Sequence, residues 1–155
     1  MPKLELISVE DDFCRGMLEE LKQYASVPDD SRDALLNTLL RNAALRVQES
    51  ADKAILKTKL RLTVQIPTSG IIRLYMGGGD VEECVDEKGE SLRFDPLPGG
   101  RLQLYRRGGE AAVTYKTQPV QAVRDSLRHT VIRYATADYD GATTQELNQI
   151  LSEAR

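Results

Sequence analysis

The chain has 155 residues and a formal net charge of −3, from 21 Lys and Arg against 24 Asp and Glu. This length suits one domain of ordinary size, and the acidic balance argues against a dedicated nucleic-acid-binding protein, which usually carries a basic excess. No segment approaches the roughly 18 apolar residues of a membrane span, and the N-terminal MPKLELISVEDDF lacks the apolar core of a secretory signal. We therefore expect neither membrane insertion nor secretion.

The first third of the chain has a helical period. Apolar residues recur at steps of four at Val9, Phe13, Met17 and Leu21, and Ser8 is placed to cap the start of a helix. A second helix is expected after Pro28, where six apolar residues share one helical face. They are Leu36, Leu39, Leu40, Ala43, Val47 and Ala51. The sequence therefore predicts an N-terminal pair of helices.

The middle of the chain changes to a period of two. KLRLTVQI alternates apolar and polar residues, which is typical of a half-buried strand. Further strand-like segments follow with turns between them, and Gly89 and Gly108–Gly109 suit tight hairpin turns because glycine tolerates positive φ. No helix separates these segments, so we expect a central antiparallel sheet of about six short strands.

The last part is helical again. Pro119 suits a first helical turn, and an apolar stripe follows as far as Tyr134. Thr143 and Glu146 have the spacing of a capping box that opens a terminal helix. The sequence thus predicts an α+β fold, with residues 1–137 as one domain and residues 138–155 as a flexible link and an amphipathic tail helix.

The stretch IIRLYMGGGDVEEC raises the question of a phosphate-binding loop. Such a loop needs a helix after its glycines, whose N–H groups point at the anion. Here the strand-like DVEECVDE follows, with five acids in eight residues, and these would repel a phosphate. The glycines are therefore interpreted as a corner between two strands, and no nucleotide cofactor is expected.

The remaining polar residues do not form a recognisable catalytic or metal-binding pattern. His129 is the only histidine and falls opposite the apolar stripe of its helix. Cys14 and Cys84 lie far apart without a CxxC motif, as expected of reduced, partly buried thiols. Five acids gather on one predicted hairpin without the spacing of a calcium loop. They are Glu82, Glu83, Asp86, Glu87 and Glu90. We predict no catalytic, cofactor-binding or metal-binding residues, and interpret the acids as a solvated hairpin or an acidic surface for a partner.

Basic residues project from one side of the first predicted strand, at Lys57, Lys59 and Arg61, and Arg106 and Arg107 add charge at a turn. These side chains are able to contact DNA phosphates as point charges. The preferred interpretation is a polar sheet face, or charge pairing with a neighbouring subunit.

The terminal helix has a small apolar face of Leu147, Ile150 and Leu151. A segment this short is poorly stable alone, so it is expected to dock. Two sites remain open, its own domain or a groove on another chain.

The order of elements resembles a known family. A helix ALLNTLLRNAALRVQESA is followed by IRLYMGGGDVEECVDEKGESLRF, a closing hairpin RLQLYRRGGEAAVTYKT, and a proline-led helix PVQAVRDSLRHTVIRYA. Across roughly residues 8–137, this pattern is similar to that of the tailed-phage head–tail connectors, also called head-completion or DNA-packaging adaptor proteins.

The resemblance implies a structural virion protein rather than an enzyme. Such proteins form a homo-oligomeric ring under the portal protein, extend the DNA channel and offer a platform to the head–tail stopper or tail protein. The implied location is the head–tail junction of a virion, after synthesis in the cytoplasm of a bacterial host. Terminal segments of the family often reach into the portal or a neighbouring subunit, a role that would suit the Leu147–Leu151 segment. DNA would pass close by without specific binding.

Two alternatives from other classes stay open at this point. One is a small metal-dependent nuclease, or another enzyme, that uses the acidic hairpin. The other is a monomeric protein-binding module.

Overall fold

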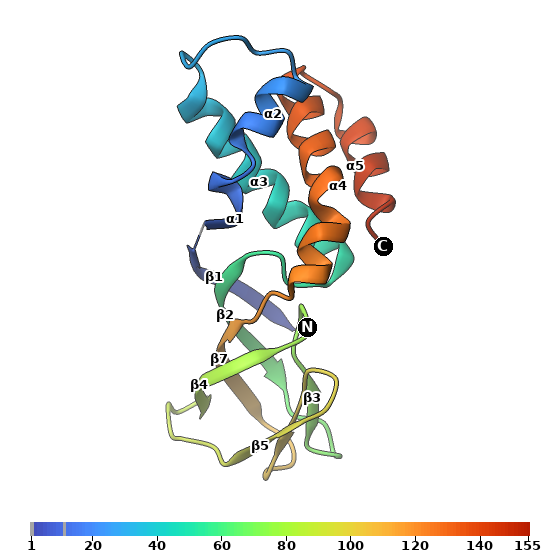
Figure 1. Ribbon diagram of the computed structural model, residues 1–155. Helices are drawn as coiled ribbons and strands as arrows, with labels where there is room; N and C mark the ends of the chain where they lie inside the picture. Colours follow the sequence, from blue (N-terminus) through green and yellow to red (C-terminus); the bar gives the residue numbers. More distant parts are fainter. Residues whose placement is uncertain (1, 11) are drawn as a thin grey trace. The chain divides into compact units, whose positions relative to one another are not determined.

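The computed structural model describes residues 2–10 and 12–155, and it confirms the predicted α+β class. Two compact units make up the chain (Figure 1). The β unit consists of Met1–Glu10 and Lys57–Gln118, and the helical unit consists of Asp11–Leu56 and Pro119–Arg155. The helical unit is thus built from two stretches of sequence, one before and one after the stretch Lys57–Gln118.

The β unit contains two antiparallel sheets. Its strands are β1 (Lys3–Glu10), β2 (Lys57–Gln65), β3 (Ile71–Arg73), β4 (Gly79–Asp86), β5 (Phe94–Leu97), β6 (Arg101–Leu104) and β7 (Glu110–Thr117). Sheet A has the order β1-β2-β7-β4, and sheet B has the order β3-β6-β5. The expected antiparallel strands are present, but they are divided between two sheets and a seventh strand joins them. The expected strand SLRF is displaced: β5 shares only Phe94 with it and continues through Pro96 and Leu97, which were expected to break the strand.

The additional strand is β1, where the sequence analysis expected a helix to begin at Ser8. That expectation is wrong for residues 8–10, because they belong to β1 and pair with β2, with Val9 opposite Thr58. The segment KLELISVE has its own alternation of Leu4 and Leu6, and long-range pairing with β2 satisfies its backbone groups. Helical structure begins only after β1, in two short helices.

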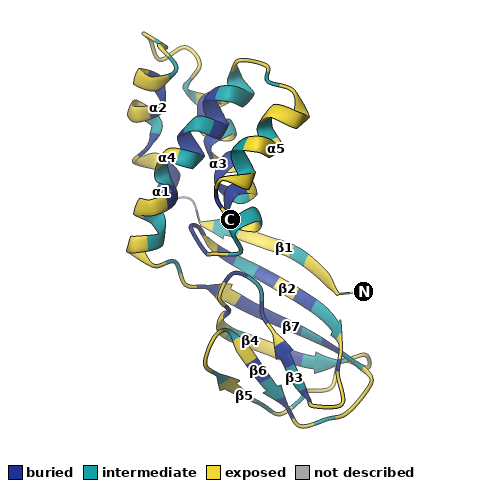
Figure 2. Ribbon diagram, turned by 90° about the vertical axis from the view of Figure 1, so that its right-hand side faces the viewer, coloured by how far each residue is buried: buried dark blue, intermediate teal, exposed yellow. Residues whose placement is uncertain are grey.

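The apolar faces of both sheets form the core of the β unit. Residues that point to this core from strands β2, β3, β4, β6 and β7 are buried, and they are Leu60, Leu62, Ile72, Cys84, Leu102, Leu104, Val113 and Tyr115. Buried and more exposed positions alternate along β2, β7 is mostly buried, and β1 is largely exposed at the edge of sheet A (Figure 2). The core is mostly aliphatic, as the scarcity of Phe and the lack of Trp imply.

The triple-glycine stretch is a corner between strands, as predicted. Gly79 begins β4, and a Cβ atom built on it would lie 1.8 Å from the carbonyl oxygen of Lys116 on β7. No side chain fits at that separation. Gly79 therefore serves the close approach of two strands.

The helical unit consists of α1 (Asp12–Arg15), α2 (Leu18–Tyr24), α3 (Asp33–Ala51), α4 (Gln121–Tyr139) and α5 (Thr144–Ser152). The two long helices contact each other and bury the stripes that the sequence predicted, including Leu36, Leu40 and Val47 on α3 and Leu127 and Val131 on α4. None of the helices in the described part of the chain has the length and apolar character needed to span a membrane.

The loop between α2 and α3 is held by a buried lysine. The Lys22 side chain is only 7% exposed; its ammonium lies 3.0 Å from the Asp33 carboxylate and donates a hydrogen bond to Asp30. Hydrogen bonds to Asp30 and Asp33 raise the pKa of Lys22, so it stays charged. This arrangement fixes the loop across the start of α3.

Candidate interaction surfaces

The basic strip predicted on the first strand lies on the solvent-facing side of sheet A. Lys57, Lys59 and Arg61 alternate with the buried residues of β2, so they share one face. The register sets Lys59 directly opposite Lys116 of β7, a residue that sequence reasoning did not include. A shallow cavity of about 170 Å³ is lined by Ser8, Glu10, Lys57, Thr58, Lys59 and Lys116.

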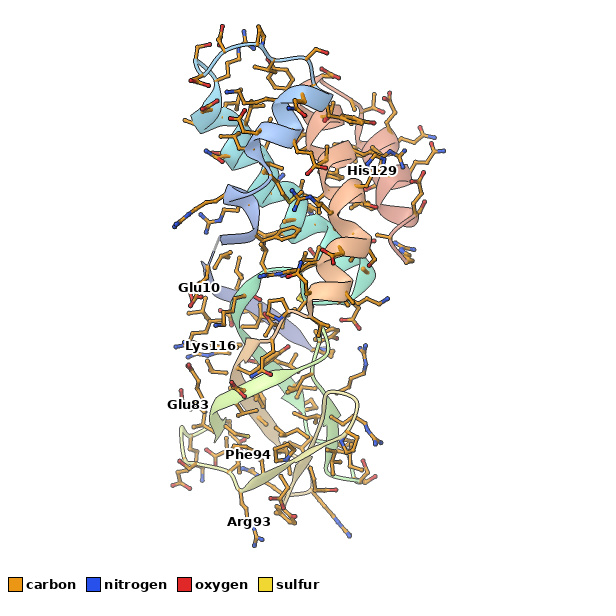
Figure 3. The ribbon with its side chains drawn as sticks, in the orientation of Figure 1. Glu10, Glu83, Arg93, Phe94, Lys116 and His129 are labelled. Carbon is orange, nitrogen blue, oxygen red and sulfur yellow. The ribbon has the colours of Figure 1, made fainter. Side chains whose placement is uncertain are left out.

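Acidic residues from the flanking strands lie beside this strip. Glu82 of β4 accepts from Lys59 at 2.8 Å and lies 3.5 Å from the Lys116 ammonium. The hydrogen bond from Lys59 lowers the pKa of Glu82. Glu10 pairs with Lys57 in the β1–β2 register, and Figure 3 shows Glu10, Lys116 and Glu83 along the same side of the β unit. The charges on this face are therefore mixed rather than uniformly positive.

The acidic hairpin uses two of its acids to hold its own turn. Asp86 accepts hydrogen bonds from the N–H groups of Lys88 and Glu90, both at 2.9 Å. Glu87 accepts from Arg106 at 2.7 Å and from the N–H of Glu110 at 3.2 Å. A bond from its own N–H, then these two bonds, lower the pKa of Glu87 to about 2. Asp86 and Glu87 thus fasten the hairpin to the turn that precedes β7.

In the described part of the chain, the acidic residues do not form a metal site. Among residues 2–10 and 12–155, no group of three or more His, Cys, Asp or Glu side chains has a geometry able to hold a metal ion. His129 is exposed on α4, where its ring meets the Tyr24 ring edge-on with centroids 5.9 Å apart. Cys14 and Cys84 are both buried, and desolvation raises the pKa of the Cys84 thiol to about 11.

The terminal helix α5 lies against its own unit. Leu147, Ile150 and Leu151 are half-buried, and no residue of α5 itself is fully buried. The Ser50 hydroxyl of α3 donates to the Leu151 carbonyl at 3.1 Å, and an ion pair joins Arg133 of α4 to Glu153. The apolar face is covered only in part, so it remains available to a second surface.

Helix α5 begins at the N-cap residue that the sequence predicted, Thr143. The Thr143 hydroxyl accepts from the N–H of Glu146 at 3.2 Å. Helix α4 continues to Tyr139, so it includes the first two residues of the predicted link.

Sequence reasoning did not identify a second basic surface, on the outer face of sheet B. Arg73, Arg93 and Arg101 come from three different strands or their immediate ends, and the register of sheet B sets them on one face. Each arginine occurs in a segment where apolar and polar residues alternate, so the sequence indicates that its side chain points to solvent. That the three arginines share one face follows only from the pairing of β3, β6 and β5.

Comparison with known proteins gives a match in structure. No protein-family model and no curated protein matches the sequence. A chain from the neck of an empty gene transfer agent particle, computed with C6 symmetry, matches 99% of this chain and 95% of its own length, with a TM-score of 0.69 and 17% identity. This chain is therefore similar in fold to that chain of the particle neck.

Two further structures of gene transfer agent particles contain chains that are similar to this one. A chain from the virion of the native gene transfer agent particle has a TM-score of 0.65 and 17% identity over 98% of this chain and 94% of its own. A chain from the neck of the native particle, computed with C12 symmetry, has a TM-score of 0.60 and 16% identity over 99% and 94%. The likeness thus includes both units of this chain, and at these identities it concerns the fold.

Proposed function

We propose that this chain is a structural head–tail connector of a phage, a prophage or a similar particle. In this proposal, copies of the chain form a ring under a portal protein, extend the DNA channel, and present a platform to a stopper or tail protein. The observation that carries the proposal is the similarity in fold, over almost the whole chain, to proteins from the necks of gene transfer agent particles.

The surfaces of the chain support an assembling protein. The mixed charges on sheet A, with Lys57, Lys59 and Arg61 beside carboxylates, suit contacts between subunits. Several large apolar residues are also exposed, including Leu4, Leu6 and Ile7 on β1 and Leu35 on α3. Such residues, together with polar neighbours, are typical of surfaces that become covered in an assembly.

The experiment is co-expression of the full chain with a portal protein from the same genome, followed by size-exclusion chromatography and negative-stain microscopy. We expect a stoichiometric complex with a ring of this chain on the portal. A chain that elutes apart from the portal at every ratio would contradict the proposal. So would clear thermal stabilisation by Mg²⁺ or Mn²⁺ together with cleavage of DNA, which would favour the enzyme alternative.

We further propose that residues 138–155 are the partner-binding tail of the connector. Leu147, Ile150 and Leu151 would leave their partial cover on the helical unit and enter a groove on the portal or a neighbouring subunit. A short amphipathic helix with no fully buried residue is suited to such a transfer, because little apolar contact is lost when it leaves.

This second proposal is tested by replacing Leu147, Ile150 and Leu151 with Ala and repeating the co-purification. We expect the triple variant to keep its circular dichroism spectrum and to lose the portal. The matched control replaces Gln145, Asn148 and Gln149, which are exposed on the same helix. Equal losses in the two variants would contradict a specific role of the apolar face.

A further inference from the structure

Strand β1 is an open edge of sheet A. In the part of the chain that the structure describes, β1 has β2 on one side and no strand on the other (Figure 2). The opposite edge, β4, is covered over its second half by the segment that follows it, where the N–H of Leu92 bonds to the carbonyl of Cys84 at 2.8 Å. An uncovered edge presents unpaired N–H and C=O groups to a further strand. Sheet A can therefore be extended at β1.

Large apolar side chains accompany these backbone groups. The exposed fractions of Leu4, Leu6 and Ile7 are 37%, 48% and 46%. Leu4 and Leu6 lie opposite Leu62 and Leu60 of β2, which are buried, so they continue the apolar face of sheet A to its edge. Exposed apolar residues beside unpaired strand groups indicate a surface that a partner covers.

A bulge gives β1 a symmetric order of faces. The register with β2 shifts between Leu6 and Ser8, so Ile7 is an extra residue in the middle of the strand. The residues that lie opposite buried residues of β2, and so share the apolar face, are Leu4, Leu6 and Val9. The residues on the other face are Lys3, Glu5, Ser8 and Glu10. From either end of β1 inward, the first three residues therefore lie on the polar, the apolar and again the polar face.

A second copy of β1 matches this order. When two copies lie antiparallel with Leu6 of one opposite Ile7 of the other, the extra residue of each strand has a counterpart, and every other pair joins residues of the same face. The pairs, each present twice, are Lys3 with Glu10, Leu4 with Val9, Glu5 with Ser8 and Leu6 with Ile7. A partner strand without a bulge is out of step with one half of β1, because its side chains change face at every residue. The bulge thus favours a second copy of this chain over an ordinary strand.

The charges select the same register. Lys3 and Glu10 are both exposed, and they lie opposite each other at the two ends of the strand pair. Opposite charges in direct cross-strand pairs stabilise a sheet, and like charges destabilise it. A slip of two residues loses these charge pairs: in one direction it sets Lys3 opposite Ser8, and in the other it sets Glu5 opposite Glu10. The Lys3 ammonium lies 3.5 Å from its own Glu5, but both side chains are exposed, and such contacts contribute little to stability.

We propose that β1 pairs antiparallel with β1 of a second copy of this chain, in the register that sets Lys3 opposite Glu10. The two four-stranded sheets then form one sheet of eight strands across a two-fold axis, and Leu4, Leu6 and Ile7 are covered. A two-fold contact closes as a dimer and does not by itself build a ring. The dimer is therefore a state of the chain outside the ring of the proposed function. One strand pair is small beside the standard interface of about 800 Å² per partner, so the dimer is weak and depends on concentration.

The test is sedimentation velocity of the full chain from about 10 µM to about 1 mM, the range in which weak interfaces form. We expect the natural chain to shift from monomer to dimer. K3E and E10K each set like charges opposite one another in both charge pairs, so each alone should dimerise at least about tenfold more weakly. An equimolar mixture of the two variants should dimerise like the natural chain, because every charge pair in the mixed dimer joins an acid to a lysine. The matched control E83K makes the same change of charge on β4 and should not alter dimerisation.

Several results would overturn the inference. They are a natural chain that stays monomeric at about 1 mM, an E10K variant that dimerises as tightly as the natural chain, and a mixture that dimerises no more tightly than K3E or E10K alone. If a variant loses its circular dichroism spectrum, carbodiimide crosslinking of isotope-labelled and unlabelled natural chains replaces it. We expect a crosslink that joins Lys3 of a labelled chain to Glu10 of an unlabelled one, and a dimer without this crosslink would exclude the register. Portal co-purification of E10K is independent of these outcomes, since loss of the dimer leaves the connector role intact.

Discussion

The hydroxyl of Tyr115 closes two hydrogen bonds with the backbone of Tyr75: it accepts from the N–H at 3.0 Å and donates to the carbonyl at 3.1 Å. Tyr115 is fully buried on β7, and Tyr75 follows β3, so this contact joins the strands of the two sheets. We expect Tyr115→Phe to lower the free energy of unfolding by about 1–3 kcal/mol, because it leaves two backbone groups without their partner. Urea denaturation measures this loss. Tyr105→Phe, at an exposed site, is the control and should change stability by less than about 0.5 kcal/mol.

The close approach of β4 to β7 makes Gly79 intolerant of any side chain. Gly79→Ala sets a Cβ atom against the Lys116 carbonyl, so we expect destabilisation on the order of 4 kcal/mol or an insoluble product. Gly77→Ala is the comparison, because Gly77 has a φ of +78° with open space around it. We expect Gly77→Ala to lower the free energy of unfolding by only about 1–2 kcal/mol, because an alanine is strained at positive φ but meets no neighbouring atom. Thermal melts of the two variants that come out alike would contradict a steric role for Gly79.

The Glu87 carboxylate makes the β unit sensitive to acid. Its pKa is lowered from 4.5 to about 2, so its stabilising contribution is present in full above pH 5 and is lost as the pH falls toward 2. We expect the melting temperature of Glu87→Gln to fall less steeply than that of the natural chain across this range. Melting temperatures that fall equally steeply with pH in the two chains would contradict this role of Glu87. Glu83→Gln, at an exposed site on β4, is the matched control.

The Cys84 thiol should be unreactive in the folded chain. Its pKa is raised from 9.0 to about 11 by burial, so the thiolate fraction at pH 8 is about 100-fold lower than for an ordinary thiol. Labelling of Cys84 by a maleimide at pH 8 should therefore be slow, and fast after denaturation in guanidinium. The variant Cys14→Ala leaves Cys84 as the only thiol that the maleimide can label. Rapid labelling of this variant in its folded form would contradict the burial of Cys84.

The cap of α5 should control how often the tail opens. Thr143→Ala removes the acceptor for the N–H of Glu146, which is expected to cost about 1 kcal/mol of helix stability. Hydrogen exchange should then rise about fivefold across residues 144–152. Thr144→Ala, one position later and outside the cap, is the control and should leave the exchange rates of α5 unchanged.

Local patterns in the sequence were sufficient for most of the fold. The alternation in β2, the apolar faces of α3 and α4, and the capping box at Thr143 each follow from residues within a few positions of one another. The N-terminal strand was not predicted, because Val9 to Leu21 happens to fit a helical stripe and the decisive partner, β2, lies far away in the sequence. Strand pairing between distant segments is a tertiary effect that local propensity does not encode.

The surfaces were harder to predict than the core for the same reason. Lys57, Lys59 and Arg61 occur within one strand, so their common face was evident from sequence. The neutralising partner Glu82 and the neighbour Lys116 come from other strands and required the register. Arg73, Arg93 and Arg101 belong to three segments, and only the pairing of β3, β6 and β5 shows that they share a face.

The position of β1 also has a consequence for synthesis. β1 is made before its partner β2, because the segment that includes α1, α2 and α3 lies between them in the sequence. At bacterial elongation rates of about 5–20 residues per second, β1 waits for several seconds before β2 is available to pair with it. During that interval α1, α2 and α3 can form, so the nascent chain acquires helices before its sheet. Each newly made chain therefore passes through a stage in which β1 is unpaired and exposes Leu4, Leu6 and Ile7 to a chaperone.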